Sequence, residues 1–212
     1  MILIRYCGGL GNQMFQYAFQ TAIQEKYKGI SVKADLSHYI LNHEHNGFEL
    51  EKYFQIRLQE AERKEIKKYS PYYMPSAEVL MMPKAIRNFV TERYQYRYAE
   101  QKKKKNPEGF YRQEYHSSFE PKVFDLDRNK DWYLDGLWQN LRYLDGYEEK
   151  VRKAFTFHNE ELYTAQDREW KEQIEKSNSV GIHIRRGDFV NSKFDICSEE
   201  YFRKAIKILN EQ

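Results

Sequence analysis

The chain has few of the features that mark several common classes of protein. It has two cysteines in 212 residues, Cys7 and Cys197, which are far apart and lack metal-ligand spacing. This favours packing thiols in a reducing compartment over a disulfide framework. No apolar run approaches the roughly 20 residues that span a bilayer, and the N-terminal MILIRYCGG has no signal-peptide cleavage site. We therefore expect a cytoplasmic protein.

A strong excess of one charge is also missing. The 35 basic and 32 acidic residues leave a net charge of +3, which is too mild to demand a nucleic acid partner. A local exception is the basic run Lys102–Lys105, which follows a stretch rich in Tyr and Arg that begins at residue 93. This run is a solvated loop tip, a point of peripheral contact with an anionic membrane surface at the inner face of the cell membrane or, as the least favoured of the three, a nucleic acid contact.

Several motifs of cofactor and metal chemistry are absent. The glycines near the N-terminus do not make GxGxxG, because Met14 and Phe15 stand where the third glycine would be, and no Walker A sequence follows them. His38, His43 and His45 favour a solvated loop over a metal site, since no paired carboxylate or cysteine accompanies them. We predict no metal and no cofactor.

The first 35 residues predict a parallel βαβ unit. Ile2–Tyr6 has the length of a strand, and the apolar spacing over 12–28 is helical, with Asn12 as a suitable N-cap. Residues 30–35 alternate as a second strand does. Strand, glycine turn, helix and strand in this order are typical of an α/β fold.

Further elements are weaker along the rest of the chain. We expect helices over 59–69, 85–101, 159–177 and 198–211, the last capped by Ser198, and strands near 131–139 and over Ser179–Ile184. Trp132 and Trp138 either stack on a sugar ring or pack in the core, and core packing is the commoner role for such residues.

The first candidate motif is the glycine turn Gly8-Gly9-Leu10-Gly11-Asn12-Gln13. Glycines between a strand and a helix let the backbone approach an anion, and the helix N-terminus offers N–H groups and a positive dipole end. The amides of Asn12 and Gln13 suit a hydroxyl-rich ligand. The alternative is a tight turn with a structural role alone.

The second candidate motif is His183-Ile184-Arg185-Arg186-Gly187-Asp188, at the carboxyl end of the predicted strand Ser179–Ile184. Open α/β sheets bind ligands at that edge, and paired guanidinium groups bind phosphate oxygens in a bidentate way. A diphosphate site without metal is favoured over a salt-bridged strand end.

These two motifs resemble a known family. The segment from Gly8 to Ala18 is similar to the N-terminal signature of glycosyltransferase family 11. Residues 180–189 resemble the HxRRGD motif of α-1,2-, α-1,6- and protein O-fucosyltransferases. Asp135-Gly136-Leu137-Trp138-Gln139 resembles a segment between them, with Leu137 in place of a tyrosine.

The resemblance implies a GT-B fold of two Rossmann-like domains with a cleft between them. It implies an inverting, metal-independent α-1,2-fucosyltransferase that moves L-fucose from GDP-β-L-fucose to the 2-hydroxyl group of a galactose-containing glycan. Arg185 and Asp188 would be catalytic, with Arg185 neutralising the leaving phosphate. The donor would be bound by His183, Arg186, Gly8, Gly9, Gly11, Asn12 and Gln13.

Under this resemblance, residues 1–155 are the acceptor-side domain and residues 156–212 begin the GDP-fucose-binding domain. Members of the family continue well past the arginine motif, so we expect this second domain to be incomplete here. The alternative to a transferase is a non-catalytic remnant, a module that binds a glycan or a nucleotide without transferring a sugar.

Overall fold

The computed structural model describes residues 1–41, 46–70, 81–90, 109–157, 161, 163–184, 190 and 196–211. The chain divides into two compact units, Met1–Leu162 and Tyr163–Gln212, and each is described by itself. Arg185, Arg186 and Asp188 lie outside the described residues, as does the basic run 102–105. Among the described helices, none is long and apolar enough to cross a membrane.

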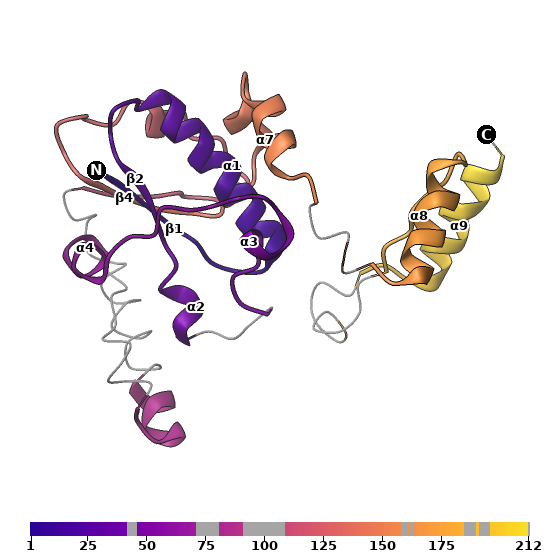
Figure 1. Ribbon diagram of the computed structural model, residues 1–212, viewed down its shortest axis with the longest axis horizontal. Helices are drawn as coiled ribbons and strands as arrows, with labels where there is room; N and C mark the ends of the chain where they lie inside the picture. Colours follow the sequence, from indigo (N-terminus) through magenta and orange to yellow (C-terminus); the bar gives the residue numbers. More distant parts are fainter. Residues whose placement is uncertain are drawn as a thin grey trace. The chain divides into compact units, whose positions relative to one another are not determined.

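Four parallel strands form the centre of the first unit (Figure 1). They lie in the order β2-β1-β4-β3, with β1 at Ile2–Arg5, β2 at Val32–Asp35, β3 at Phe110–Arg112 and β4 at Trp132–Asp135. Ile2 pairs with Val32 on one side and with Trp132 on the other. The predicted α/β class and the parallel βαβ start are confirmed, while the two-domain GT-B arrangement stays a prediction.

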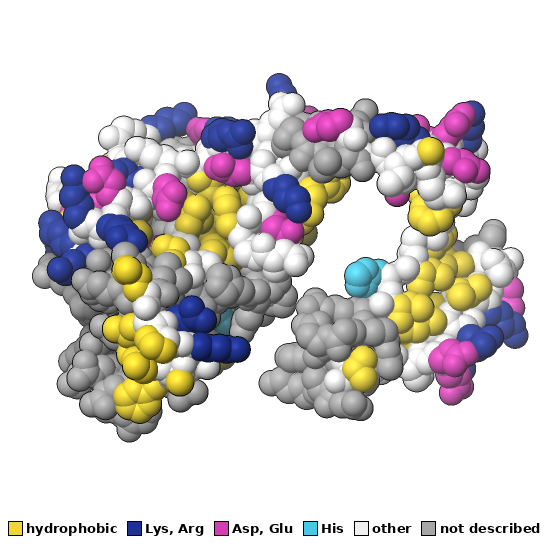
Figure 2. Space-filling view, turned by 60° about the horizontal axis from the view of Figure 1, so that its bottom comes forward, with side chains coloured by type: hydrophobic (Ala, Val, Ile, Leu, Met, Phe, Trp, Pro, Cys, Tyr) yellow, Lys and Arg dark blue, Asp and Glu magenta, His cyan; other side chains and the backbone are white. Residues whose placement is uncertain are grey.

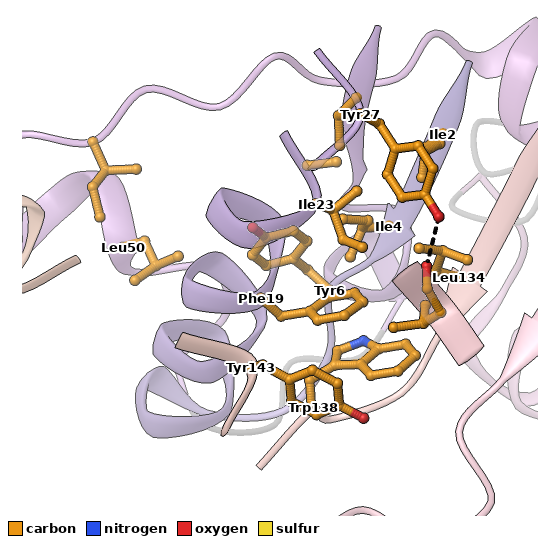
Figure 3. Close-up of a cluster of buried hydrophobic side chains, with 14 of the residues drawn as sticks. Ile2, Ile4, Tyr6, Phe19, Ile23, Tyr27, Leu50, Leu134, Trp138 and Tyr143 are labelled. Carbon is orange, nitrogen blue, oxygen red and sulfur yellow. Dashed lines mark hydrogen bonds between the residues drawn. The ribbon is translucent and has the colours of Figure 1, made fainter. Parts of the chain in front are cut away.

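Helix α1 (Leu10–Lys26) covers one face of this sheet (Figure 1). Its side chains Phe19 and Ile23 are fully buried and pack with Ile2 and Ile4 of β1 (Figure 3). The predicted N-cap, Asn12, is wrong by three residues. The N-cap is Gly9, whose extended backbone lets the helix begin at Leu10, and the side chain of Asn12 bonds instead to Gln139.

Shorter elements complete the unit. They are α2 (His38–Leu41), α3 (Leu50–Tyr53), α4 (Arg63–Tyr69), the 3-10 turns η1 (Pro121–Phe124) and η2 (Leu141–Leu144), α7 (Glu148–Ala154) and a helical segment over 84–90. Helix α4 lies against the face opposite α1, where Ile66 packs with Leu3 and Tyr133 in a second, smaller cluster. Because neighbouring residues of a strand point to opposite faces, the sheet is buried on both sides.

Tyr27, the C-cap of α1, joins this helix to the segment around η1 (Figure 3). Its hydroxyl group donates a hydrogen bond to the carbonyl oxygen of Val123 (3.0 Å) and accepts one from the backbone N–H of Leu126 (2.8 Å). Tyr27 is 2% exposed, so neither backbone group has ready access to water.

The variant Tyr27→Phe should therefore lower the free energy of unfolding by about 2–4 kcal/mol, because it leaves two buried backbone groups without a partner. Urea denaturation measures this difference. Tyr17→Phe is the matched control, since the Tyr17 hydroxyl group makes no hydrogen bond among the described residues. Equal stabilities of the two variants would contradict the assignment.

The second unit contains two capped helices. Helix α8 (Ala165–Glu175) has a capping box between Thr164 and Asp167, and α9 (Glu199–Asn210) is capped by Ser198, as predicted. The predicted strand over Ser179–Ile184 is wrong. These residues form no strand, and Val180, Ile182 and Ile184 are 60%, 50% and 56% exposed.

The physical reason is the lack of a partner. A strand is stabilised by hydrogen bonds to a neighbouring strand, and the described part of the second unit contains none. Figure 2 shows hydrophobic side chains on the surface of this unit. The exposed hydrophobic residues of this unit include Trp170 and Ile174 of α8 and Ile206 and Leu209 of α9, each at least 40% exposed.

Candidate functional site

The carboxyl ends of the four strands of the first unit lie along one edge of the sheet. In parallel α/β sheets ligands bind outside this edge. The two central strands, β1 and β4, are neighbours there, although they are far apart in the sequence. The turns that follow them are the glycine turn (residues 7–13) and the tryptophan turn (residues 136–140), and together they form the candidate site.

The glycine turn has a backbone that other residues would disturb. Gly8 has a φ of +79°, and a Cβ atom there would lie 2.2 Å from Nδ2 of Asn12. Gly9 caps α1 without a side chain, and the first turn of the helix contains no acidic residue. The first backbone N–H groups of a helix have no partner within it and carry its positive dipole end. The turn can therefore offer donors to an anion or to sugar hydroxyl groups.

Gln13 supports this turn from behind. It is fully buried, and its side-chain amide donates to the carbonyl oxygens of Gly8 (3.0 Å) and Gly47 (2.8 Å) and accepts from the N–H of Glu49 (2.9 Å). The Gly8 carbonyl also accepts from the hydroxyl group of Tyr39 (3.0 Å). Gln13 therefore holds the backbone of the turn in place, and its amide is already used by the protein.

The tryptophan turn is pinned to the glycine turn. Trp138 is 1% exposed and stacks on Phe19 of α1, with ring centroids 3.9 Å apart and planes inclined by 6° (Figure 3). Next to it, Nε2 of Gln139 donates a 2.7 Å hydrogen bond to Oδ1 of Asn12. Of the two roles considered for Trp138, the structure shows core packing. Trp132 likewise packs against the core and is partly buried.

A row of charged residues ends the strands on the α4 face of the sheet. Asp35, Arg5, Asp135 and Arg112 are the last residues of β2, β1, β4 and β3. Asp135 accepts from Nη1 of Arg5 (3.1 Å) and from Nε of Arg112 (2.8 Å). Asp35 accepts from the hydroxyl group of buried Tyr133 (2.6 Å). None of these four residues is among the site residues predicted from the sequence. The signal was a charged residue at the end of each apolar run.

His38 adjoins the charged row. Nη2 of Arg5 lies 3.3 Å from Nδ1 of His38, and an arginine only donates, so this nitrogen is an unprotonated acceptor. Burial, with the charge of Arg5 beside it, lowers the pKa of His38 to about 4. The imidazole is therefore neutral in the folded protein at neutral pH.

This shift predicts a pH dependence of stability. The unfolded chain takes up the His38 proton near pH 6.5, whereas the folded chain does so at a pKa of about 4. Between these values the unfolded state holds more protons, so the free energy of unfolding falls as the pH is lowered. The difference in stability between wild type and His38→Asn should shrink from pH 7 to pH 4.5 in urea titrations. A constant difference would contradict the prediction.

The glycines of the turn allow a test that separates structure from binding. Gly8→Ala should lower the free energy of unfolding by about 1–2 kcal/mol, because alanine at φ +79° is strained and its Cβ meets Asn12. Gly11→Ala should be neutral or stabilising by up to about 1 kcal/mol, since a Cβ at Gly11 meets nothing within 4 Å and alanine favours the helix. Thermal or urea unfolding of both variants measures the contrast.

The other predicted site residues belong to the second unit. His183 is exposed, and Arg185, Arg186 and Asp188 lie outside the described residues. A common cleft for the two motifs therefore stays a prediction. Among the described residues, no three His, Cys, Asp or Glu side chains gather as a metal site would require.

Comparisons with known proteins give a consistent result. Residues 1–212 match the sequence profile described as Glycosyl transferase family 11. An alpha-1,2-colitosyltransferase of Escherichia coli is 29% identical over 218 residues, covering 100% of this chain and 65% of that protein. The O-antigen biosynthesis glycosyltransferase WbnK of Escherichia coli is 24% identical over 226 residues, covering 96% and 66%. The chain thus spans just under two thirds of the length of these relatives. No solved structure matches it.

Proposed function

This chain belongs to glycosyltransferase family 11, because all 212 residues match the profile of that family. We propose that it serves the transfer of L-fucose from GDP-β-L-fucose to the 2-hydroxyl group of a galactose-containing glycan. The reaction would invert the anomeric carbon without a metal. The acceptor hydroxyl group gives up its proton to a base as its oxygen attacks this carbon, the bond from the carbon to the β-phosphate oxygen breaks, and GDP leaves.

The observation that supports the proposal most directly is the glycine turn at the end of β1. It combines a glycine at positive φ, a helix N-terminus without a side-chain cap, and the half-buried amide of Asn12. We assign Gly8, Gly9, Gly11 and Asn12 to the donor, with Asn12 near the transferred sugar. Gln13 would support donor binding indirectly, because its amide holds the carbonyl group of Gly8 in place.

We assign to the second motif the stabilisation of the negative charge on the leaving diphosphate. Arg185 would stabilise the β-phosphate as the glycosidic bond breaks, and Arg186 would bind the diphosphate. Asp188 would be the second catalytic residue, and His183 would help to bind the donor. We further propose that the protein works on the cytoplasmic side, in peripheral contact with an anionic membrane surface.

The donor sugar needs its own comparison, because one relative is named as a colitosyltransferase. Colitose is L-fucose without its 3-hydroxyl group. A site that bonds this hydroxyl group would prefer fucose strongly, since the analogue would leave polar groups unpaired, whereas an apolar site discriminates weakly.

The test is to incubate the purified chain with a β-galactoside acceptor in three parallel reactions, each with one donor: GDP-fucose, GDP-colitose or UDP-galactose. Transfer from GDP-fucose, with the new sugar α-linked at the 2-hydroxyl group, would support the proposal. Transfer from GDP-colitose alone would correct the donor. Binding of GDP by calorimetry without any transfer would instead support the alternative, a nucleotide-binding module.

A second prediction concerns the arginines. Arg185→Ala and Arg186→Ala should each weaken GDP binding by about 10- to 150-fold, because each removes a charge-assisted contact of roughly 1.5–3 kcal/mol. Arg203→Ala is the control, since Arg203 pairs with Glu199 on the exposed surface of α9. Unchanged GDP affinity in both variants, measured by calorimetry, would rule out a diphosphate site at these arginines.

A further inference from the structure

The tryptophan turn contains an energetically costly residue. Trp138 has a φ of +56°, one of two non-glycine residues with positive φ in the described chain. A bulky side chain in this region costs about 1–3 kcal/mol. Its buried indole N–H, moreover, has no hydrogen-bond partner among the described residues. Such strain persists where the surroundings over-determine it, and it concentrates at functional sites.

Contacts from three directions hold Trp138 in this conformation. Its ring stacks on Phe19 of α1 and meets Tyr143 edge-on. Its backbone N–H donates to Oε1 of Gln113 (2.9 Å). At Gly136 a Cβ atom would lie 2.8 Å from Cβ of Gln113 and from Cε2 of Trp138, so this position of the turn has no room for a side chain.

The result of this constraint is the placement of Gln139. Its backbone N–H donates to the carbonyl oxygen of His116 (2.9 Å), which fixes the residue at the end of the strained turn. Its side chain then reaches the first turn of α1, where Nε2 donates to Oδ1 of Asn12 (2.7 Å) across 127 positions of sequence. Nδ2 of Asn12 is turned to the other side, against Gly8, and makes no hydrogen bond to a described residue.

We propose that Gln139 is a positioning residue that sets the polarity of the Asn12 amide, with Oδ1 held inside and the two Nδ2 hydrogens presented at the glycine turn to an oxygen of the donor sugar or its phosphate. The part that concerns the donor rests on the function proposed above. The strained tryptophan turn is the support that keeps Gln139 in reach. Because an amide has a donor end and an acceptor end, the orientation decides what Asn12 offers to a ligand.

The test compares Gln139→Glu and Gln139→Leu with wild type. Glutamate matches glutamine in size, but its carboxylate only accepts, so it attracts Nδ2 of Asn12 and reverses the amide. Leucine removes the bond altogether. In wild type, nuclear magnetic resonance should show a cross-relaxation signal between the Asn12 side-chain NH₂ and the Hα atoms of Gly8. Both variants should lose this signal while keeping the backbone spectrum. A signal that persists in both would overturn the proposal.

The consequence for the donor is measured separately, with GDP-fucose as the probe. In the transfer assay, Gln139→Glu should lower kcat by about 3- to 10-fold, the range for one neutral hydrogen bond, with little change in KM for the galactoside. Combining it with Asn12→Ala should cause no further loss, because Gln139 acts through Asn12. Additive losses would overturn the proposal. The resonance measurement needs no turnover, so failure of the proposed transfer and failure of the amide assignment give different results.

Discussion

The stacking of Trp138 on Phe19 is the contact on which the first unit depends most. The two rings come from segments far apart in the sequence, one in α1 and one after β4, and they lie parallel at 3.9 Å. Tyr143 meets both rings edge-on, at 5.2 Å from Phe19 and 5.7 Å from Trp138. This aromatic cluster fixes α1 relative to the turn that follows β4. The two turns of the candidate site are therefore placed by the core itself and not by the flexibility of surface loops.

Buried glutamines extend this arrangement along α1. Gln13, Gln16 and Gln20 are at most 2% exposed and follow one another at helical spacing. Gln16 accepts from the N–H of Cys7 (3.1 Å) and donates to the carbonyl oxygen of Gly136 (3.3 Å), so one side chain touches both turns. Gln20 accepts from the hydroxyl group of Tyr6 (2.9 Å). Turn backbones that leave a sheet edge need partners when they are buried, and these amides supply both donors and acceptors.

The sequence predicted well where one local pattern decides the structure. The apolar run of β1, the helical spacing after it and the alternation before Asp35 each give one answer, and together they give the parallel βαβ start. The Ser198 cap was readable for the same reason. The burial of the glutamines could not be predicted, because a polar residue on a helix is ordinarily solvated. Here it depends on backbone carbonyl groups of Gly47 and Gly136, which are distant in the sequence. The strand expected over Ser179–Ile184 failed because a strand is a property of a pair, and apolar alternation alone does not supply the neighbour.

The same limit applies to the site. Glycines at a strand end and a pair of adjacent arginines were visible as motifs, but the partnership of Asn12 with Gln139 is a tertiary contact. The charged row at the strand ends forms no sequence motif, because its members, such as Arg5 and Asp135, are isolated in the sequence and meet only when the strands are aligned. Their proximity follows from register, which single segments do not contain.

The distribution of charge in the first unit limits what the glycine turn can contribute to the proposed reaction. In the first unit, the described cations at the sheet edge are already paired: Arg5 and Arg112 share Asp135, and Lys33 pairs with Glu65 at 2.6 Å. What the glycine turn offers is therefore neutral, namely backbone N–H groups, a helix dipole and one amide. Such groups suit hydroxyl groups and partial charge, whereas a departing diphosphate requires full positive charge in a site shielded from water. In the proposed reaction that charge is assigned to Arg185 and Arg186, and the orientation of the sugar to the glycine turn.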